Sequence, residues 1–220
     1  FATAEAISAV GATPVFVDVN PINYLIELKS LEAAITPSSK AILPVHLFGY
    51  PVDMCELMHI ANKHNLKVIE DCAQAAGAQW ENQSVGSWGD VGCFSFFPTK
   101  NLGAAGDAGA ITTKDELIAK RIRELAVHGM PRRYLHSQLG YNSRMDSIQA
   151  AILNVKMPNL AKWVKKRKLI AIKYQELLND IEFIKLPFFN LYSEGHHAWN
   201  QFVIRVDFGE KNKSKILPYK

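Results

Sequence analysis

Residues 67–78 read KVIEDCAQAAGA, and residues 91–113 read VGCFSFFPTKNLGAAGDAGAITT. Each stretch contains a short apolar run of β-branched or aromatic residues next to turn signals, which predicts a β-strand. The first run is followed by Asp71, and the second carries Ser95 and is followed by Lys100. In an open α/β sheet, groups just past the carboxyl ends of the strands line the ligand crevice. The sequence therefore predicts that an acid, a hydroxyl and an amine face one cavity.

These three residue types match the needs of pyridoxal 5'-phosphate. That cofactor requires a lysine for a Schiff base, an acid against its pyridinium nitrogen and hydrogen-bond donors for its phosphate. Lys100, Asp71 and Ser95 would supply these groups in that order. Each residue taken singly also has an ordinary interpretation, because an aspartate after a strand is commonly a helix cap. A lysine in a glycine-rich loop is commonly a solvated side chain.

The order of the residues in this region is informative as well as the spacing of the three side chains. EDCAQAAGA followed by SFFPTKNLGAAGDAGAI resembles the sugar aminotransferases of the DegT/DnrJ/StrS type, a branch of the aspartate aminotransferase fold. The resemblance begins at FATAEAISAVGATPVFVDV, continues through PVHLFGYPVDM and HGMPRRYLHSQLGYNSRMDSIQAAIL, and covers about residues 1–174. It implies an α/β fold with a mostly parallel sheet sandwiched by helices, followed by the start of a small α+β domain.

The resemblance implies roles for five residues. Lys100 matches the Schiff-base lysine, and Asp71 matches the partner of the pyridine nitrogen. Gln74 matches a residue near the phenolic oxygen of the cofactor, and Ser95 matches a phosphate ligand. Asn142, in GYNSRM, matches an asparagine that reaches the phosphate from the other subunit of a homodimer.

The resemblance also implies an activity, the transfer of an amino group from glutamate to a keto group of a nucleotide-linked sugar. Such enzymes serve amino-sugar, cell-surface polysaccharide or antibiotic biosynthesis. The family often has histidine where this chain has Ala76, so no substrate role is carried over to that position. Sugar dehydratases of the same fold carry histidine at the anchor position, and Lys100 argues against them. Two alternatives stay open: a truncated, non-catalytic remnant, and a regulatory homologue that binds the cofactor only as a ligand.

Composition excludes several classes of protein. Hydrophobic residues make up 48% of the 220 residues, which excludes a disordered chain. The formal net charge of +4 is mild and is not clustered, so no nucleic-acid partner is expected. The densest basic run, residues 165–168, lies in a helical pattern and is expected to be a solvated face. No apolar run reaches the roughly 18 residues of a membrane span, so no membrane partner is expected.

The cysteines and histidines give no metal-ligand pattern. The three cysteines, at positions 55, 72 and 93, lack CxxC spacing, which favours reduced thiols in a cytoplasmic protein. His59 and His64 are five positions apart and do not share a helix face as a metal pair would. His46 is expected to be a structural residue at the end of a strand.

Periodicity predicts alternating strands and helices, with parallel pairing and right-handed crossovers. Asp53 is the expected N-cap of one helix, and Pro158 is expected to interrupt the last. The residues expected to face inward from the fourth helix are Leu117, Ile118, Ile122 and Leu125. The expected helices span 2–10, 28–35, 54–65, 115–126 and 145–179, and the expected strands span 14–19, 41–46, 68–69, 93–97, 183–186 and 199–206.

Two partial domains are expected: a cofactor-binding large domain over residues 1–157, and a linker helix with the beginning of a small domain over 158–220. Relative to the resembling family, the sequence lacks an N-terminal segment with two strands and a glycine-threonine phosphate loop. It also lacks most of the C-terminal domain, and residues 209–220 are unlike the family. We therefore expect a truncated chain.

Overall fold

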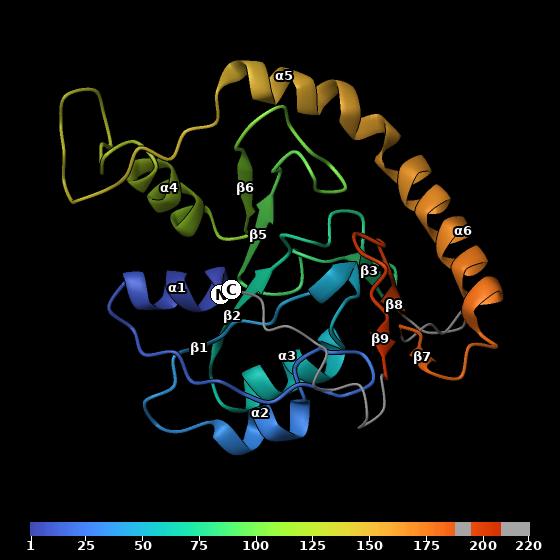
Figure 1. The fold of residues 1–220 in the computed structure, drawn as a ribbon. Coiled ribbons are helices and arrows are strands. Elements are labelled where there is room, and N and C mark those ends of the chain that lie inside the picture. Colours follow the sequence, from blue (N-terminus) through green and yellow to red (C-terminus); the bar gives the residue numbers. More distant parts are fainter. Residues whose placement is uncertain (188–194, 208–220) are drawn as a thin grey trace, which may run out of the picture.

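A computed structural model describes residues 1–187 and 195–207 of the chain. In the described part, the central sheet has the order β1-β2-β5-β6 (Figure 1). The strands β1 (Ala41–Ile42), β2 (Lys67–Asp71) and β5 (Val91–Ser95) are parallel, and β6 (Gly109–Thr112) runs antiparallel to β5. The register pairs Asp71 with Cys93, so the carboxyl ends of β2 and β5 lie side by side. The expected mixed α/β fold with a mostly parallel sheet is confirmed.

The helices follow the expected pattern closely. Figure 1 shows α5 and α6 as one long arc around the molecule, and a 3₁₀ turn at Met157–Asn159 separates them where Pro158 was expected to break the helix. Asp53 caps α3, because its side chain accepts a hydrogen bond from the Glu56 backbone N–H at 3.0 Å. The helices are α1 (Ala2–Ala9), α2 (Leu28–Ala34), α3 (Met54–Lys63), α4 (Glu116–Leu125), α5 (Ser147–Lys156) and α6 (Leu160–Leu178).

Two small antiparallel sheets flank the central one. The strands β3 (Gln79–Trp80) and β4 (Gln83–Ser84) form a hairpin, and β8 (Gly195–His196) adds to the other side of β3. Strands β7 (Ile184–Lys185) and β9 (Arg205–Val206) pair with each other. The late part of the chain therefore returns, through β8, to the hairpin formed by β3 and β4.

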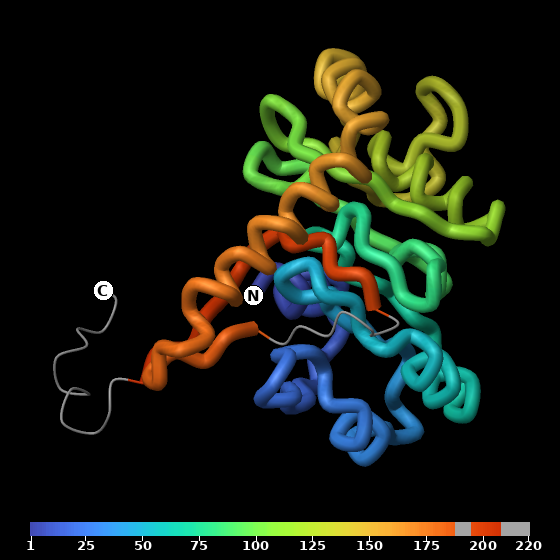
Figure 2. Tube along the Cα trace, turned by 90° about the vertical axis from the view of Figure 1, so that its right-hand side faces the viewer, coloured from blue at the N-terminus to red at the C-terminus, as the bar shows by residue number. Residues whose placement is uncertain are grey.

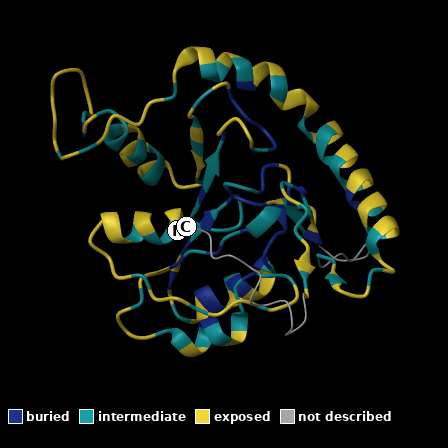
Figure 3. Cartoon of the chain, viewed as in Figure 1, coloured by how far each residue is buried: buried dark blue, intermediate teal, exposed yellow. Residues whose placement is uncertain are grey.

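Buried apolar residues gather in three clusters near the middle of the molecule, while the outer faces of α4, α5 and α6 are largely exposed (Figure 3). The largest cluster lies under α2 and α3, where apolar residues recur at helical spacing. Another cluster packs residues around the end of β5 against α5, through Ala76, Phe96, Leu102, Ala104 and Leu153.

Several expectations about elements were wrong, among them the strand at 41–46, which is limited to β1 and an isolated bridge at Val45. Residues 14–19 do not form a strand: only Val19 makes an isolated bridge, to Ile26, and Phe16 is 80% exposed. A strand needs a hydrogen-bonded neighbour, and the described chain places none beside this stretch. The expected strand at 199–206 is limited to β9. Leu117 does not face inward, since it is 79% exposed on α4.

None of the helices in the described ranges combines the length and the apolar character that crossing a bilayer would require.

Candidate active site

Asp71 stands at the end of β2 with both carboxylate oxygens hydrogen-bonded. Its Oδ2 accepts a hydrogen bond from the Thr3 hydroxyl at 2.7 Å, and its Oδ1 accepts one from the Ala73 N–H at 3.0 Å. Its backbone is tied to the chain after β1, through bonds to the Pro44 carbonyl and the His46 N–H. The carboxylate is thus fixed in orientation, and its remaining lone pairs can accept a further donor.

Lys100 sits in a tight loop that follows β5. Its backbone N–H donates to the Phe97 carbonyl at 2.9 Å, and the Ala104 N–H closes the loop by donating to the Phe96 carbonyl at 2.7 Å. The Lys100 side chain is half-buried and makes no hydrogen bond or ion pair with any residue that the structure describes. The loop therefore presents an uncommitted amine just past the carboxyl end of β5.

Helix α5 supports the base of this loop from a distance of about fifty residues along the chain. The Lys156 ammonium donates to the Gly103 carbonyl, and the Gln149 side-chain carbonyl accepts from the Ala105 N–H at 2.8 Å. Leu102 is 1% exposed and packs in the cluster below α5. The loop is therefore anchored by its buried leucine and by the two hydrogen bonds that directly follow it.

Gly103 has no room for a side chain. A Cβ added there would lie 2.4 Å from the Pro98 carbonyl oxygen, a backbone atom that cannot rotate away. We expect Gly103→Ala to lower the free energy of unfolding by about 1–3 kcal/mol, because the loop must shift to admit the methyl group. Urea unfolding at pH 7 measures this loss.

The matched control is Gly106→Ala, since a Cβ at Gly106 meets only the end of the flexible Gln149 side chain, at 3.1 Å. An equal effect of the two substitutions would contradict the crowding at Gly103.

Gln74 and Ser95 lie near the same ends of β2 and β5. The Gln74 Oε1 accepts from the Phe48 N–H at 2.6 Å, and the Gln201 N–H donates to the Phe48 carbonyl at 3.2 Å. Together they hold Phe48 at a φ of 61°, a conformation that non-glycine residues seldom adopt. The Ser95 Oγ accepts from the Phe97 N–H at 3.3 Å, which leaves the hydroxyl hydrogen able to donate.

Asn142 is not brought to this group within one chain. Asn142 is exposed, its backbone forms an isolated β-bridge with Val127, and its side chain has no hydrogen bond among the described residues. The role expected for it, reaching the site of a partner subunit, stays a prediction.

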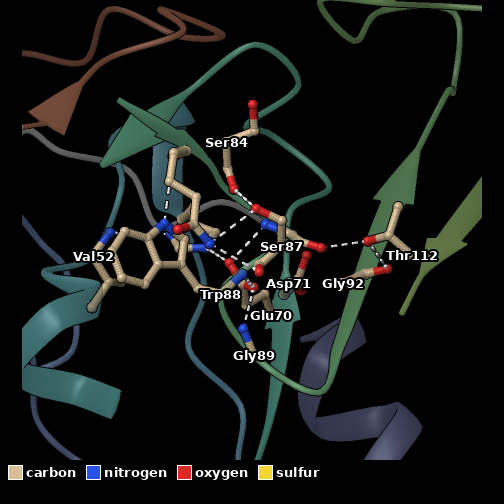
Figure 4. Close-up of polar contacts among 12 residues, drawn as sticks. Val52, Glu70, Asp71, Ser84, Ser87, Trp88, Gly89, Gly92 and Thr112 are labelled. Carbon is tan, nitrogen blue, oxygen red and sulfur yellow. Dashed lines mark hydrogen bonds and ion pairs between the residues drawn. The ribbon is translucent and has the colours of Figure 1, made fainter. Parts of the chain in front are cut away.

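Sequence reasoning missed Glu70, which is fully buried and binds four donors (Figure 4). Its Oε2 accepts from His46 Nε2 at 3.0 Å and from the Gly86 N–H at 2.7 Å. Its Oε1 accepts from the backbone N–H groups of Trp88 at 2.9 Å and Gly89 at 2.8 Å. Burial alone would raise the pKa of Glu70, but the hydrogen bonds from His46, Gly89 and Gly86 outweigh it and hold the pKa below its ordinary value.

His46 joins this network as a neutral donor, as expected of a structural residue. The Val52 N–H donates to His46 Nδ1 at 3.1 Å, so the ring hydrogen is assigned to Nε2, which donates to Glu70. Cys72 lies close enough for these three side chains to approach a common metal ion, within 4.8 Å of one another. Burial, followed by the charges of Glu70 and Asp71, raises the pKa of the Cys72 thiol. A protonated thiol and two ligands already saturated with hydrogen bonds do not favour a metal site.

Comparison with known proteins decides the family. A sequence profile of the DegT/DnrJ/EryC1/StrS aminotransferase family matches residues 1–219. The chain belongs to this family. One relative is UDP-N-acetyl-3-dehydro-alpha-D-glucosamine 3-aminotransferase of Acidithiobacillus ferrooxidans. The chain is 49% identical to it over 215 residues. The match covers 98% of the chain and 58% of that relative, so the chain spans a little over half its length.

Solved structures of the family agree with this fold. DesV of S. venezuelae, crystallised in complex with a ketimine intermediate, superposes with a TM-score of 0.90 at 38% identity, over 97% of this chain and 57% of DesV. NtdA of Bacillus subtilis, crystallised with bound cofactor PMP, gives a TM-score of 0.85 at 37% identity, over 98% of this chain and 48% of NtdA. Both superpositions cover nearly the whole chain, so its fold is shared with these two proteins.

Proposed function

We propose that the protein is a pyridoxal-phosphate-dependent aminotransferase that moves an amino group from glutamate to a keto group of a nucleotide-linked sugar. One observation carries this proposal: Asp71 ends β2 with its carboxylate fixed in orientation, and Lys100 lies in the loop after the adjacent parallel strand β5 with its amine uncommitted. The name of the relative from Acidithiobacillus ferrooxidans, an aminotransferase of a UDP-linked sugar, supports the substrate class.

The residues present fit the cofactor. The Asp71 carboxylate has free lone pairs for a pyridinium N–H, and the Ser95 hydroxyl has a hydrogen to donate to a phosphate oxygen. When bound, pyridoxal phosphate supplies an electron sink for the α-carbon of an amino donor. The NtdA structure, with its bound PMP, supports the same cofactor for this chain.

Each residue of the site has one task in this proposal. The Lys100 amine would hold the cofactor covalently, and as a free amine it would move a proton from the α-carbon of the amino donor. Asp71 keeps the pyridine nitrogen protonated, and Gln74 lies near the phenolic oxygen. Ser95 donates to the phosphate, and Asn142 reaches the same phosphate from the partner subunit of a homodimer. Thr3 orients Asp71 through its 2.7 Å hydrogen bond.

Two further parts of the proposal concern setting and organisation. We place the protein in the cytoplasm, with Cys55, Cys72 and Cys93 as free thiols. We also retain the division into a partial cofactor-binding domain at 1–157 and the beginning of a second domain at 158–220.

The test follows the amino group through both halves of the reaction. Pyridoxal phosphate added to the chain should produce a visible absorption band, and glutamate should then bleach it with formation of 2-oxoglutarate. UDP-N-acetyl-3-dehydroglucosamine, the probe suggested by the relative's name, should restore the band and yield an amino sugar detectable by mass spectrometry.

A band that glutamate does not bleach would favour the regulatory homologue, which binds the cofactor without transferring an amino group. A folded chain with no band at all would favour the non-catalytic remnant.

A further inference from the structure

Asn101, the residue next to Lys100, has an unusual environment. It is 7% exposed, and its Nδ2 donates a short hydrogen bond of 2.6 Å to the Ala198 carbonyl, 97 residues away in the sequence. Its Oδ1 is buried without any hydrogen-bond partner among the described residues. One end of this amide is therefore tightly bound, and the other is buried unpaired.

Stability does not explain such a residue. A hydrogen bond within a protein contributes only modestly to folding, whereas a buried polar atom without a partner costs as much or more. Replacing the amide with an apolar group removes the unpaired oxygen and the bond together, but it also leaves the buried Ala198 carbonyl without that donor, so the two effects on stability oppose each other. A buried unpaired group in a native protein calls for another explanation, and a role in the site is one of them.

The segment that Asn101 holds is itself fixed to the rest of the site. The Ala198 N–H donates to the Gly49 carbonyl at 2.8 Å, and the Arg167 guanidinium of α6 donates to the Trp199 carbonyl at 3.0 Å. A Cβ on Gly49 would lie 2.9 Å from the Gln74 carbonyl oxygen, so the loops after β1 and β2 pack closely here. Figure 2 shows this late segment running alongside α6.

We propose that Asn101 is a positioning residue for Lys100. Its bond to the Ala198 carbonyl ties the loop after β5 to a segment that is already held against the loop after β1 and against α6. The amine is thereby kept at a fixed place relative to Asp71. The loop is held at its base by α5, through Lys156 and Gln149, and at its far side by Asn101.

Where it concerns the cofactor, this inference rests on the proposed function. Asn101→Leu keeps the shape and removes the bond. We expect its urea midpoint without cofactor to stay close to that of the wild type, because removal of the buried unpaired oxygen offsets the loss of the donor to the Ala198 carbonyl. We also expect covalent capture of pyridoxal phosphate, followed by the growth of the visible band, to be on the order of tenfold to a hundredfold slower, because small misplacements of reacting groups cost rates of this size.

A readout without cofactor keeps the two proposals separate. The hydrogen-bonded amides of Lys100 and Ala104 should exchange with deuterium on the order of tenfold faster in Asn101→Leu, since local opening sets their exchange. If the wild type forms no visible band, the proposed function fails, and the exchange experiment still tests the anchoring. Wild-type exchange in a folded Asn101→Leu chain would overturn the anchoring.

The matched control is Asn200→Leu, which removes another buried amide oxygen without a partner among the described residues and leaves the Asn101 bond in place. It should show wild-type exchange in the loop and wild-type capture of the cofactor. If Asn101→Leu is too unstable to purify, Asn101→Ala tests the same bond with a smaller side chain. Equal effects of the substitutions at 101 and 200, or equal losses of stability and capture at 101, would make Asn101 merely structural and overturn the proposal.

Discussion

Replacing Lys100 with alanine should abolish the visible band that pyridoxal phosphate forms with the wild-type chain, and lower amino transfer at least about a thousandfold. The physical reason is that no other group of the loop can form the covalent bond to the cofactor. The free energy of unfolding should change by no more than about 0.5 kcal/mol, because the half-buried side chain has no partner among the described residues. Absorption spectra and borohydride reduction followed by peptide mass mapping measure the loss.

The control is Lys114→Ala, an exposed lysine on the turn before α4, which should keep the band. A persistent band in Lys100→Ala, with the reduced cofactor mapped to another lysine, would show that Lys100 is not the anchor.

Replacing Glu70 with glutamine should destabilise the chain by about 2–6 kcal/mol at pH 7, because two buried donors lose their acceptor and each such loss costs about 1–3 kcal/mol. Glutamine has the same size, but one end of its amide carries hydrogens and would face donors. Both carboxylate oxygens accept two hydrogen bonds each, so neither orientation of the amide satisfies the four donors. Urea unfolding gives the difference.

Lowering the pH should reduce the difference in free energy of unfolding between the wild type and Glu70→Gln. The direction of this change follows from the lowered pKa of Glu70. A carboxyl group whose folded pKa lies below its unfolded value contributes stability that is fully present above the unfolded pKa and is lost as the pH falls through the folded value. Glutamine does not titrate, so the wild type should lose its advantage as the pH falls below about 4.3, the ordinary value for glutamate.

The matched control is Glu32→Gln, because the Glu32 carboxylate also accepts a hydrogen bond, from the Lys63 ammonium at 2.8 Å, but lies on the surface. Its substitution should cost much less stability than that of Glu70. Comparable losses at the two glutamates would contradict the importance of burial for the Glu70 network.

The sequence predicted the parts of the fold that local chemistry controls. The start of α3 at Asp53 and the break at Pro158 could be predicted, because a capping carboxylate and a missing backbone N–H act on residues only a few positions away. The strands that carry Asp71 and Ser95 could also be predicted, since short apolar runs followed by polar residues identify strand ends. Residues 14–19 also alternate in the way typical of a strand. They form none, because a strand also needs a hydrogen-bonded neighbour elsewhere in the chain.

The supporting residues of the site could not be predicted in this way. Thr3 and Asn101 act through partners 68 and 97 residues away, and no local pattern signals such a contact. Glu70 left one signal that could have been used: an acid within a strand that is otherwise apolar must either face water or find buried donors. The structure shows the second outcome, with three of those donors supplied by the backbone of one turn.

The anchoring of the loop after β5 has a consequence for how the protein folds. Its supports are contributed by residues 44, 53 and 97 positions away along the sequence, all of them downstream. Contacts with such wide separations close late, after the entropy of bringing remote segments together has been overcome. The Lys100 amine is therefore expected to be loosely held until the segment around Ala198 has packed against the loop, so the loop gains its final position late in the folding of the described chain.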